Sequence, residues 1–261
     1  MQRLPPEEEN ALEQERTSVI LQHLYRNGAT SVAELAQMLS CSEATVRRDL
    51  QELAGQNRLV RTHGGARVRV PAPNPLGASL AAEKSRIGAA AALLVEERDA
   101  IGFNGGSTCF HVAAQLRAMR AEWPVTAVTN ALNVASELAT GTAFKVVMTG
   151  GVVSKRSLEC GGPLATAFVS DLHLNRVFIG VDGFSLEHGV TTDYEVEGHI
   201  TKDLISKADQ LIVVADHSKL GRVAFVQIVP ASAVQVLVTD SGAPAEFVAA
   251  AEARGIRVIQ A

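Results

Sequence analysis

The sequence of 261 residues contains no run of about 18 consecutive apolar residues, the pattern that marks a membrane-spanning helix. Its first residues, with Pro5, Pro6 and three successive glutamates, lack the apolar core of a signal peptide. We therefore expect a cytoplasmic protein without a membrane partner. The three cysteines, Cys41, Cys109 and Cys160, are too far apart for a metal-ligand motif and are expected to be reduced thiols. Neither a metal site nor a cofactor is expected.

Lysine is absent before residue 84, and arginine provides the positive charge of the N-terminal part. The net charge of −4 is unevenly distributed. Residues 16–70 hold eight arginines and four acidic residues, a net charge of +4, while residues 1–15 and residues 71–261 each carry −4. Contact with DNA phosphates depends on such a local basic segment more than on the total charge. The overall acidity therefore does not exclude a nucleic-acid partner.

A proline-rich segment divides the chain. Pro71, Pro73 and Pro75 occupy alternate positions, which favours an extended spacer and forbids a continuous helix. The predicted organisation is a first domain over residues 1–70, a linker over residues 71–79 and a second domain over residues 80–261. The basic segment falls within the first domain.

The first domain has the pattern of two helices joined by a short turn. Ser31 and Glu34 form a capping box at the start of one helix, and Ser42 is positioned to cap the next. In that second helix, Val46 and Leu50 fall on one apolar face. Two helices so closely joined are typical of a helix-turn-helix.

The second helix and the segment after it are rich in groups that bind DNA. Arginine pairs bidentately with guanine or phosphate, threonine contacts a thymine methyl group, and a helix N-terminus presents N–H groups to a phosphate. Two β-prone runs around Gly64 and Gly65 predict a basic hairpin, the wing of a winged helix-turn-helix. The predicted DNA-binding residues are Ser42, Thr45, Arg47, Arg48, Arg61 and His63. The alternative is a small helical bundle with a solvated arginine face.

From about residue 98, short β-branched runs alternate with helical patterns. This alternation predicts a Rossmann-like α/β domain, with a mostly parallel sheet covered by helices on both faces. The expected strands span residues 100–103, 125–129, 144–149, 176–180, 211–215, 234–239 and 257–259. The expected helices span residues 80–97, 107–119, 131–139, 195–207 and 245–253.

Ligands bind beyond the carboxyl ends of the strands in such sheets, so the residues that follow each strand are informative. Five of these loops carry glycine, amide, hydroxyl, carboxylate or ammonium groups. Glycines and free N–H groups at a helix start suit a phosphate, and the mixture as a whole suits a phosphorylated polyol. The predicted effector-binding residues are Asn104, Gly105, Gly106, Ser107, Thr108, Asn130, Gly150, Gly151, Asp182 and Lys219.

Several motifs resemble the DeoR family of bacterial transcriptional regulators. They are Thr-Val-Arg-Arg-Asp-Leu at residues 45–50, Arg-Thr-His-Gly-Gly-Ala at residues 61–66, and Ala-Asp-His-Ser-Lys at residues 215–219. The resemblance implies a double-stranded DNA operator as partner, a sensor domain similar in fold to ribose-5-phosphate isomerase, and a small phosphorylated sugar as effector. Where the family commonly has Asp-Ser-Gly, this chain has Asn104, Gly105 and Gly106.

The sequence therefore predicts a transcriptional regulator of carbohydrate-metabolism genes, in this family usually a repressor, and not an enzyme. Because helix-turn-helix proteins commonly bind DNA as dimers, a homo-oligomer is expected. The alternative is an isomerase-like enzyme, with Asp182, Asp193, Glu195 and Lys202 as acid–base groups. A second alternative is a sensor that acts only through protein partners, whose arginine-rich domain would have no salt-sensitive affinity for DNA.

Overall fold

The computed structural model describes residues 16–17, 19–21, 23–24, 29–55, 59–62, 64–68 and 80–261. The chain divides into two compact units, Met1–Pro71 and Ala72–Ala261. His63 and the predicted linker lie outside the described residues, so the limits given for the two domains stay predictions. Within the described part of the chain, no helix combines the length and apolar character that are needed to cross a membrane.

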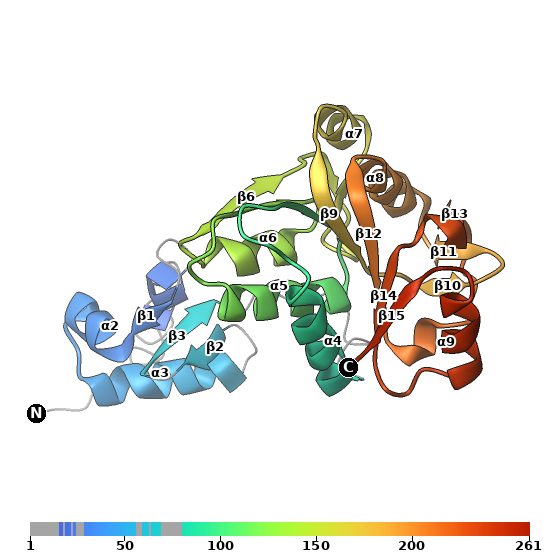
Figure 1. Cartoon of the computed structure of the whole chain (residues 1–261). Helices are drawn as coiled ribbons and strands as arrows, with labels where there is room; N and C mark the ends of the chain where they lie inside the picture. The colour runs from blue at the N-terminus through green and yellow to red at the C-terminus, as the bar shows by residue number, and fades with distance from the viewer. Residues whose placement is uncertain are drawn as a thin grey trace, which may run out of the picture. The chain divides into compact units, whose positions relative to one another are not determined.

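The first unit combines a small antiparallel sheet with helices (Figure 1). Its elements are β1 Thr30–Ser31, α2 Val32–Leu39, α3 Glu43–Gly55, β2 Leu59–Thr62 and β3 Gly65–Val68, and residues 16–24 are helical where they are described. β3 lies between β1 and β2. The predicted winged helix-turn-helix is therefore confirmed.

Local interactions explain these elements. The Ser31 hydroxyl accepts the Glu34 N–H at 3.2 Å, and the Glu34 carboxylate accepts the Ser31 N–H at 2.9 Å, so the predicted capping box is formed. Gly64 has a φ of +82° in the hairpin turn. A Cβ at Gly65 would lie 2.2 Å from the Thr30 carbonyl oxygen. Both positions therefore require a residue without a side chain.

A buried ion pair ties the first helix of this unit to α3. The Asp49 carboxylate is fully buried, and Arg16 holds it at both oxygens, with Nη2 2.8 Å from Oδ1 and Nε 2.5 Å from Oδ2. The pair adjoins an apolar core made by Ile20, Leu21, Leu24, Val32, Leu35, Ala36, Val46, Leu50, Leu53, Leu59 and Ala66. One arginine of the basic segment thus has a structural role.

The second unit is built on a seven-stranded sheet. The strands lie in the order β6 Phe144–Met148, β5 Val125–Thr129, β4 Ala100–Phe103, β9 Leu174–Ile179, β12 Ala208–Val214, β14 Val236–Thr239 and β15 Arg257–Gln260. Every neighbouring pair is parallel. Each of the seven predicted strands is present, which confirms the Rossmann-like α/β class.

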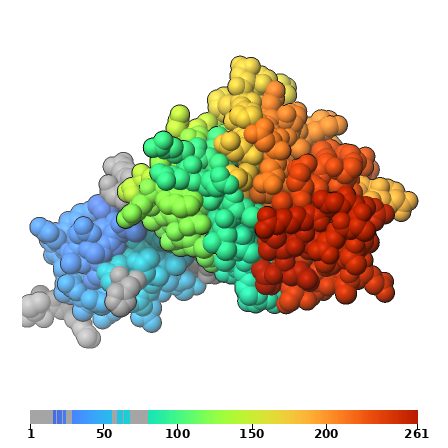
Figure 2. Space-filling model, in the orientation of Figure 1, coloured from blue at the N-terminus to red at the C-terminus, as the bar shows by residue number. Residues whose placement is uncertain are grey.

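Helices cover both faces of this sheet (Figure 1). One face carries α4 Ala81–Ala92, α5 Ser107–Met119 and α6 Leu132–Ala139, and the other carries α7 Pro163–Val169, α8 Glu195–Ser206 and α9 Ala245–Glu252. Neighbouring strand residues alternate between the two cores, as Ile212 and Val213 do. In the space-filling view, the red C-terminal segment packs directly against the green α4 segment (Figure 2).

Some elements differ from the expectations. The helix expected over residues 80–97 ends at Ala92, where the N–H groups of Leu94 and Val95 bond to carbonyl groups three residues earlier instead of four. Beyond it, the Asp99 carboxylate accepts the Glu96 N–H at 2.8 Å and pairs with Arg176. Helix α7 and several short strands are not predicted, since such segments carry too little periodicity. These strands are β7 Val152–Val153, β8 Cys160–Gly161, β10 Gly183–Ser185, β11 Gly189–Thr192 and β13 Val226–Val229.

Removal of the Arg16 side chain is expected to destabilise the first unit. The Arg16→Ala change leaves the Asp49 carboxylate buried without its guanidinium, and losing one partner of a buried ion pair costs about 3–5 kcal/mol. Arg47→Ala is the matched control, because its exposed pair with Glu43 belongs to a class worth about 0–1 kcal/mol. Hydrogen exchange of α3 peptides measures both effects. Equal protection in the two variants would contradict a stabilising role for Arg16.

Candidate functional site

The sheet contains one point, between β4 and β9, at which the connections that follow two neighbouring strands run in opposite directions. From β4 the chain continues to β5 and β6 on one side, and it then returns to β9 on the other side of β4. The loops after β4 and β9 therefore diverge, and open α/β sheets bind ligands beyond such a switch point. A cavity of about 190 Å³ lies here, lined by residues that follow β4, β9 and β12.

Asn104, the first residue after β4, joins the two diverging loops. Its side-chain NH₂ donates to the Gly180 carbonyl at 2.9 Å, and its side-chain oxygen accepts the Gly180 N–H at 2.8 Å. The same oxygen accepts the Cys109 thiol at 3.2 Å. Asn104 lines the cavity, but its amide holds the loop after β9 in place.

The start of α5 opens into the cavity without a side-chain cap. The N-cap residue Gly106 has a φ of +94°, and a Cβ there would meet no atom within 4 Å. The first N–H groups of a helix have no partner within the helix, and with the helix dipole they attract an anion. Ser107 and Thr108 add two hydroxyls in the same turn. This turn has the chemistry of a phosphate site.

Two lysines also line the cavity. Lys219 lies in the loop after β12. Lys84, on α4, is 6% exposed, and its Nζ is 3.8 Å from a carboxylate oxygen of Asp216. α4 comes this close to α5 because Gly88, one turn after Lys84, has no side chain: a Cβ there would lie 2.7 Å from the His111 carbonyl oxygen.

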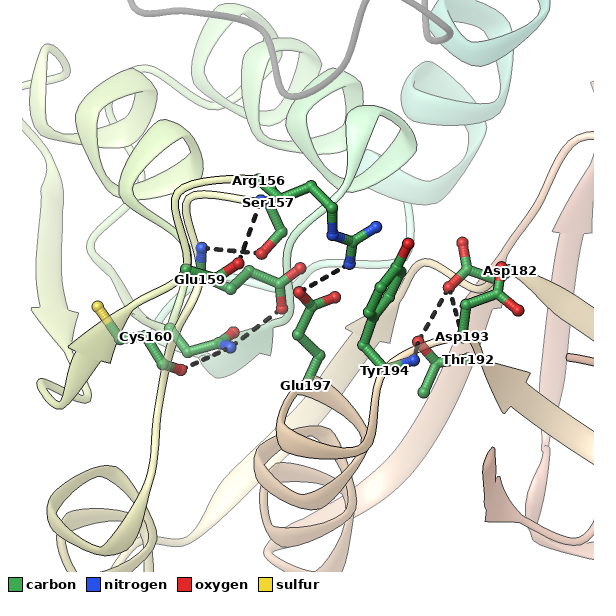
Figure 3. Close-up of polar contacts among 11 residues, drawn as sticks. Arg156, Ser157, Glu159, Cys160, Asp182, Thr192, Asp193, Tyr194 and Glu197 are labelled. Carbon is green, nitrogen blue, oxygen red and sulfur yellow. Dashed lines mark hydrogen bonds and ion pairs between the residues drawn. The ribbon is translucent and has the colours of Figure 1, made fainter. Parts of the chain in front are cut away.

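Four carboxylates, those of Glu159, Asp182, Glu197 and Asp216, line the same cavity. Figure 3 shows the first three. Glu159 is 6% exposed, and its Oε2 accepts the Asn130 NH₂ at 3.1 Å. Burial, and after it the nearby Glu197 carboxylate, raises the pKa of Glu159 to about 7. Hydrogen bonds from Asn130 and from the Gly105 backbone act in the opposite direction. Glu159 therefore exchanges its proton near neutral pH.

Contacts with neighbouring side chains orient the carboxylates of Glu197 and Asp182 (Figure 3). Arg156 places its Nη2 3.0 Å from Glu197 Oε1, and its guanidinium lies over the ring of Tyr194. Asp182 accepts the hydroxyl of Thr192 at 2.9 Å. The loop that carries Arg156 is thereby fastened to the start of α8.

The structure brings together seven of the ten predicted effector-binding residues. Those that line the cavity are Asn104, Gly105, Gly106, Ser107, Thr108, Asp182 and Lys219. Asn130 is fully buried, where its NH₂ donates to Glu159 and to the Cys160 carbonyl. Gly150 and Gly151, with φ of +73° and +106°, form the turn before β7. The binding role of all ten stays a prediction.

The cavity also has lining residues that were not among the predicted effector-binding residues. They are Lys84, Arg156, Ser157, Glu159, Gly180, Val181, Thr192, Glu197, Thr201, Asp216 and Ile228. Lys84 had a detectable signal, because it falls on the inward face of α4 with Ile87 and Ala91, where a lysine is unusual. Glu159 had none, because its loop reaches the cavity only when the chain has folded back from β6.

The predicted DNA-binding residues lie on α3 and on the hairpin of the first unit. Ser42 caps α3, since its Oγ accepts the Thr45 N–H at 3.1 Å. Of the predicted residues, Ser42, Arg47, Arg48 and Arg61 are exposed, Thr45 is partly exposed, and His63 is outside the described residues. The exposed side of α3 thus presents hydroxyl and guanidinium groups.

Comparison with protein families agrees with this architecture. Residues 16–71 match the DeoR-like helix-turn-helix domain, and residues 79–241 match the DeoR C terminal sensor domain. The chain belongs to the DeoR family. A DeoR-family chain with this helix-turn-helix is a DNA-binding transcriptional regulator with a DNA operator as partner, which confirms the predicted family and class of function.

Individual proteins support the same assignment. A putative aga operon transcriptional repressor of Escherichia coli is 31% identical, over 94% of this chain and 93% of its own length. The HTH-type transcriptional repressor GlcR of Bacillus subtilis is 30% identical, over 87% of this chain and 88% of its own length. Since these DeoR-family relatives are regulators, the prediction that the chain is not an enzyme is confirmed.

A similar solved structure is the ribose 5-phosphate isomerase of Methanocaldococcus jannaschii. It aligns with 54% of this chain and 55% of its own, at 19% identity and a TM-score of 0.41. The α/β class of the DeoR-family sensor unit is established independently by its own parallel sheet and two helical layers.

The stability of the sensor unit is expected to depend on pH through Glu159. Its pKa is about 7 in the folded chain, against the ordinary 4.5. The folded state therefore holds more protons than the unfolded state between these values, so the free energy of unfolding falls as pH rises through this interval. The decline amounts to roughly 2–4 kcal/mol and ends above the folded pKa.

The Glu159→Gln protein cannot titrate at this position, so its free energy of unfolding should lack this decline. Urea unfolding, followed by the fluorescence of Trp123, the single tryptophan, reports on the sensor unit. Relative to the parent, Glu159→Gln should gain stability between about pH 5 and about pH 8. Glu252→Gln, at the exposed end of α9, is the control. A difference between parent and Glu159→Gln that is independent of pH would contradict the raised pKa.

Proposed function

We propose that this DeoR-family regulator is a repressor of carbohydrate-metabolism genes whose binding to the operator is controlled by a small phosphorylated sugar. The observation that carries the proposal is the switch-point cavity, in which the uncapped start of α5 and two lysines occur together with four carboxylates, one of which, Asp216, pairs with Lys84. The sign of regulation is supported by the two relatives described above as repressors.

In this proposal the start of α5 and the two lysines hold the phosphate. A phosphate monoester carries about −1.5 to −2 charge at neutral pH, and N–H, hydroxyl and ammonium groups are its usual partners. Gly106, Ser107 and Thr108 supply N–H and hydroxyl groups, and Lys84 and Lys219 supply positive charge. An unphosphorylated sugar would leave these groups without their anion.

The sugar hydroxyls then donate to the carboxylates. Glu159, Glu197 and Asp182 offer acceptor oxygens in the same cavity, and the hydroxyl of Thr192 is next to Asp182. The cavity volume, about 190 Å³, is below the range of about 300–1,000 Å³ for pockets that hold drug-sized ligands. A small polar metabolite fits this size and this lining.

The DNA contacts in this proposal come from the first unit. α3 enters the major groove, where Thr45, Arg47 and Arg48 face base edges or phosphates, and the start of the helix at Ser42 faces a phosphate. The hairpin that carries Arg61 contacts the DNA backbone, and His63, which lies outside the described residues, is proposed to add to this contact. The effector changes regulation through its different affinities for the DNA-bound and the free protein.

Lys219→Ala is expected to weaken sugar-phosphate binding by about ten- to a hundredfold, because one hydrogen bond to a charged group is lost. Lys219→Arg should retain part of the affinity, since both side chains carry the charge. Lys202→Ala, an exposed lysine on α8, is the control. Calorimetric titration with a panel of pentose and hexose phosphates, and with the same sugars unphosphorylated, measures each affinity. Equal binding by Lys219→Ala and the parent would reject this phosphate site.

Arg48→Ala is expected to weaken operator binding by about 1–3 kcal/mol if the arginine pairs with a base, and Arg47→Ala to weaken it comparably. The probe is a duplex selected by the parent protein from a random library. Arg257→Ala, the same change on the sensor unit, is the control. Titrations at several salt concentrations also test for a protein-only sensor, since a protein that binds DNA phosphates loses affinity as salt rises. Unchanged affinity in both α3 variants would remove the recognition-helix assignment.

A further inference from the structure

Six apolar side chains remain exposed where β7, α7 and the start of α8 come together. The exposed fractions are 80% for Val152, 76% for Leu164 and 55% for Val196. The full set, here called the apolar face, is Val152, Val153, Leu164, Phe168, Tyr194 and Val196. Contiguous apolar surface of this kind marks an interaction site more often than a solvated one.

The members of the apolar face lie on elements that pack against one another. Val152, Val153, Tyr194 and Val196 line one groove of about 520 Å³. Leu164 and Phe168, the other two members, lie one turn apart on α7 and so share a side of that helix. α7 packs against both β8 and α8, and Figure 1 shows α7 and α8 side by side. The face is therefore one surface formed by three elements.

The apolar face carries both signs of charge. Arg156 and Glu195 line the groove, and Lys155, next to Arg156, is exposed. The basic residues come from the loop after β7, whereas Glu195 comes from the first turn of α8. An anionic partner such as nucleic acid would be repelled by part of this surface. A partner that places an acidic group opposite the basic loop and a basic group opposite Glu195 would be complementary to it.

We propose that the apolar face is the contact surface between two copies of this chain, related by a two-fold axis. In such a contact each copy contributes the same surface, so an apolar patch meets an apolar patch and the basic edge meets the acidic edge. Lys155 then faces the partner's Glu195, while Arg156 keeps its pair with Glu197 of its own chain. A dimer also meets the geometric need of a helix-turn-helix protein, which reads two half-sites with two recognition helices.

This contact adjoins the candidate effector cavity. Arg156, Glu159 and Glu197 line both the groove and the cavity. The loop between β7 and β8, which carries Arg156 and Glu159 (Figure 3), therefore lines both the groove and the cavity. A second copy on the apolar face covers the outer side of this loop.

Sedimentation velocity of the full-length chain over a range of concentrations tests the proposal. The parent should form a dimer, and Val152→Asp and Leu164→Asp should each weaken dimerisation by at least about a hundredfold, because a charge is buried in both copies. Both side chains are exposed, so neither change disturbs the core. Leu93→Asp is the matched control, since Leu93 is 59% exposed but precedes the opposite, amino end of β4.

A monomeric parent would overturn the proposal. Unchanged dimerisation in both aspartate variants, or equal loss in Leu93→Asp, would overturn it as well. The charge arrangement has its own test: Glu195→Lys should weaken the dimer, and adding Lys155→Glu should restore it, since the pair is then reversed in both copies. Failure of the double variant to recover would overturn the two-fold arrangement.

Discussion

The hydrogen bonds between the Asn104 side chain and the Gly180 backbone hold the candidate site together. They join the end of β4 to the end of β9, the two strands from which the sheet extends in opposite directions. Asn104 also directly precedes the two glycines before α5, and Asp182 follows Gly180 by two residues. The same contact therefore fixes the uncapped helix start relative to the carboxylates, and both ends of the cavity depend on it.

Two pairs of opposite charge lie in the cavity, and Glu159 belongs to neither of them. Lys84 lies 3.8 Å from Asp216, and Arg156 lies 3.0 Å from Glu197. Such pairs reduce the cost of burying single charges. Glu159 forms no ion pair with any residue of the described ranges, and burial raises its pKa to about 7. In the proposed complex, a sugar hydroxyl that donates to Glu159 would favour its ionised form, because a hydrogen bond to the charged form lowers the pKa of a carboxyl group.

Sequence patterns predicted the features that depend on neighbouring residues. The capping box at Ser31, the helix that Ser42 caps and all seven strands of the sheet follow from local spacing, and the structure contains each of them. What could not be predicted depends on contacts between distant residues. Glu159 reaches Gly105 from a segment more than fifty residues later, and Gly150 and Gly151, whose binding role stays a prediction, lie just before β7 and are not among the residues that line the cavity.

The departure of Asn104 and Gly105 from the family's Asp-Ser has a physical reason in this structure. An aspartate at position 104 has no N–H to donate, so its charge would lie against the Gly180 carbonyl oxygen in place of the present hydrogen bond. A side chain at position 105 would bring its Cβ 2.3 Å from Glu159 Oε1, and Glu159 would have to move. The three residues therefore depend on one another. The uncharged Asn104 side chain joins the loops after β4 and β9. Gly105 leaves the space that the Glu159 side chain occupies, and Glu159 supplies a carboxylate to the site from the loop between β7 and β8.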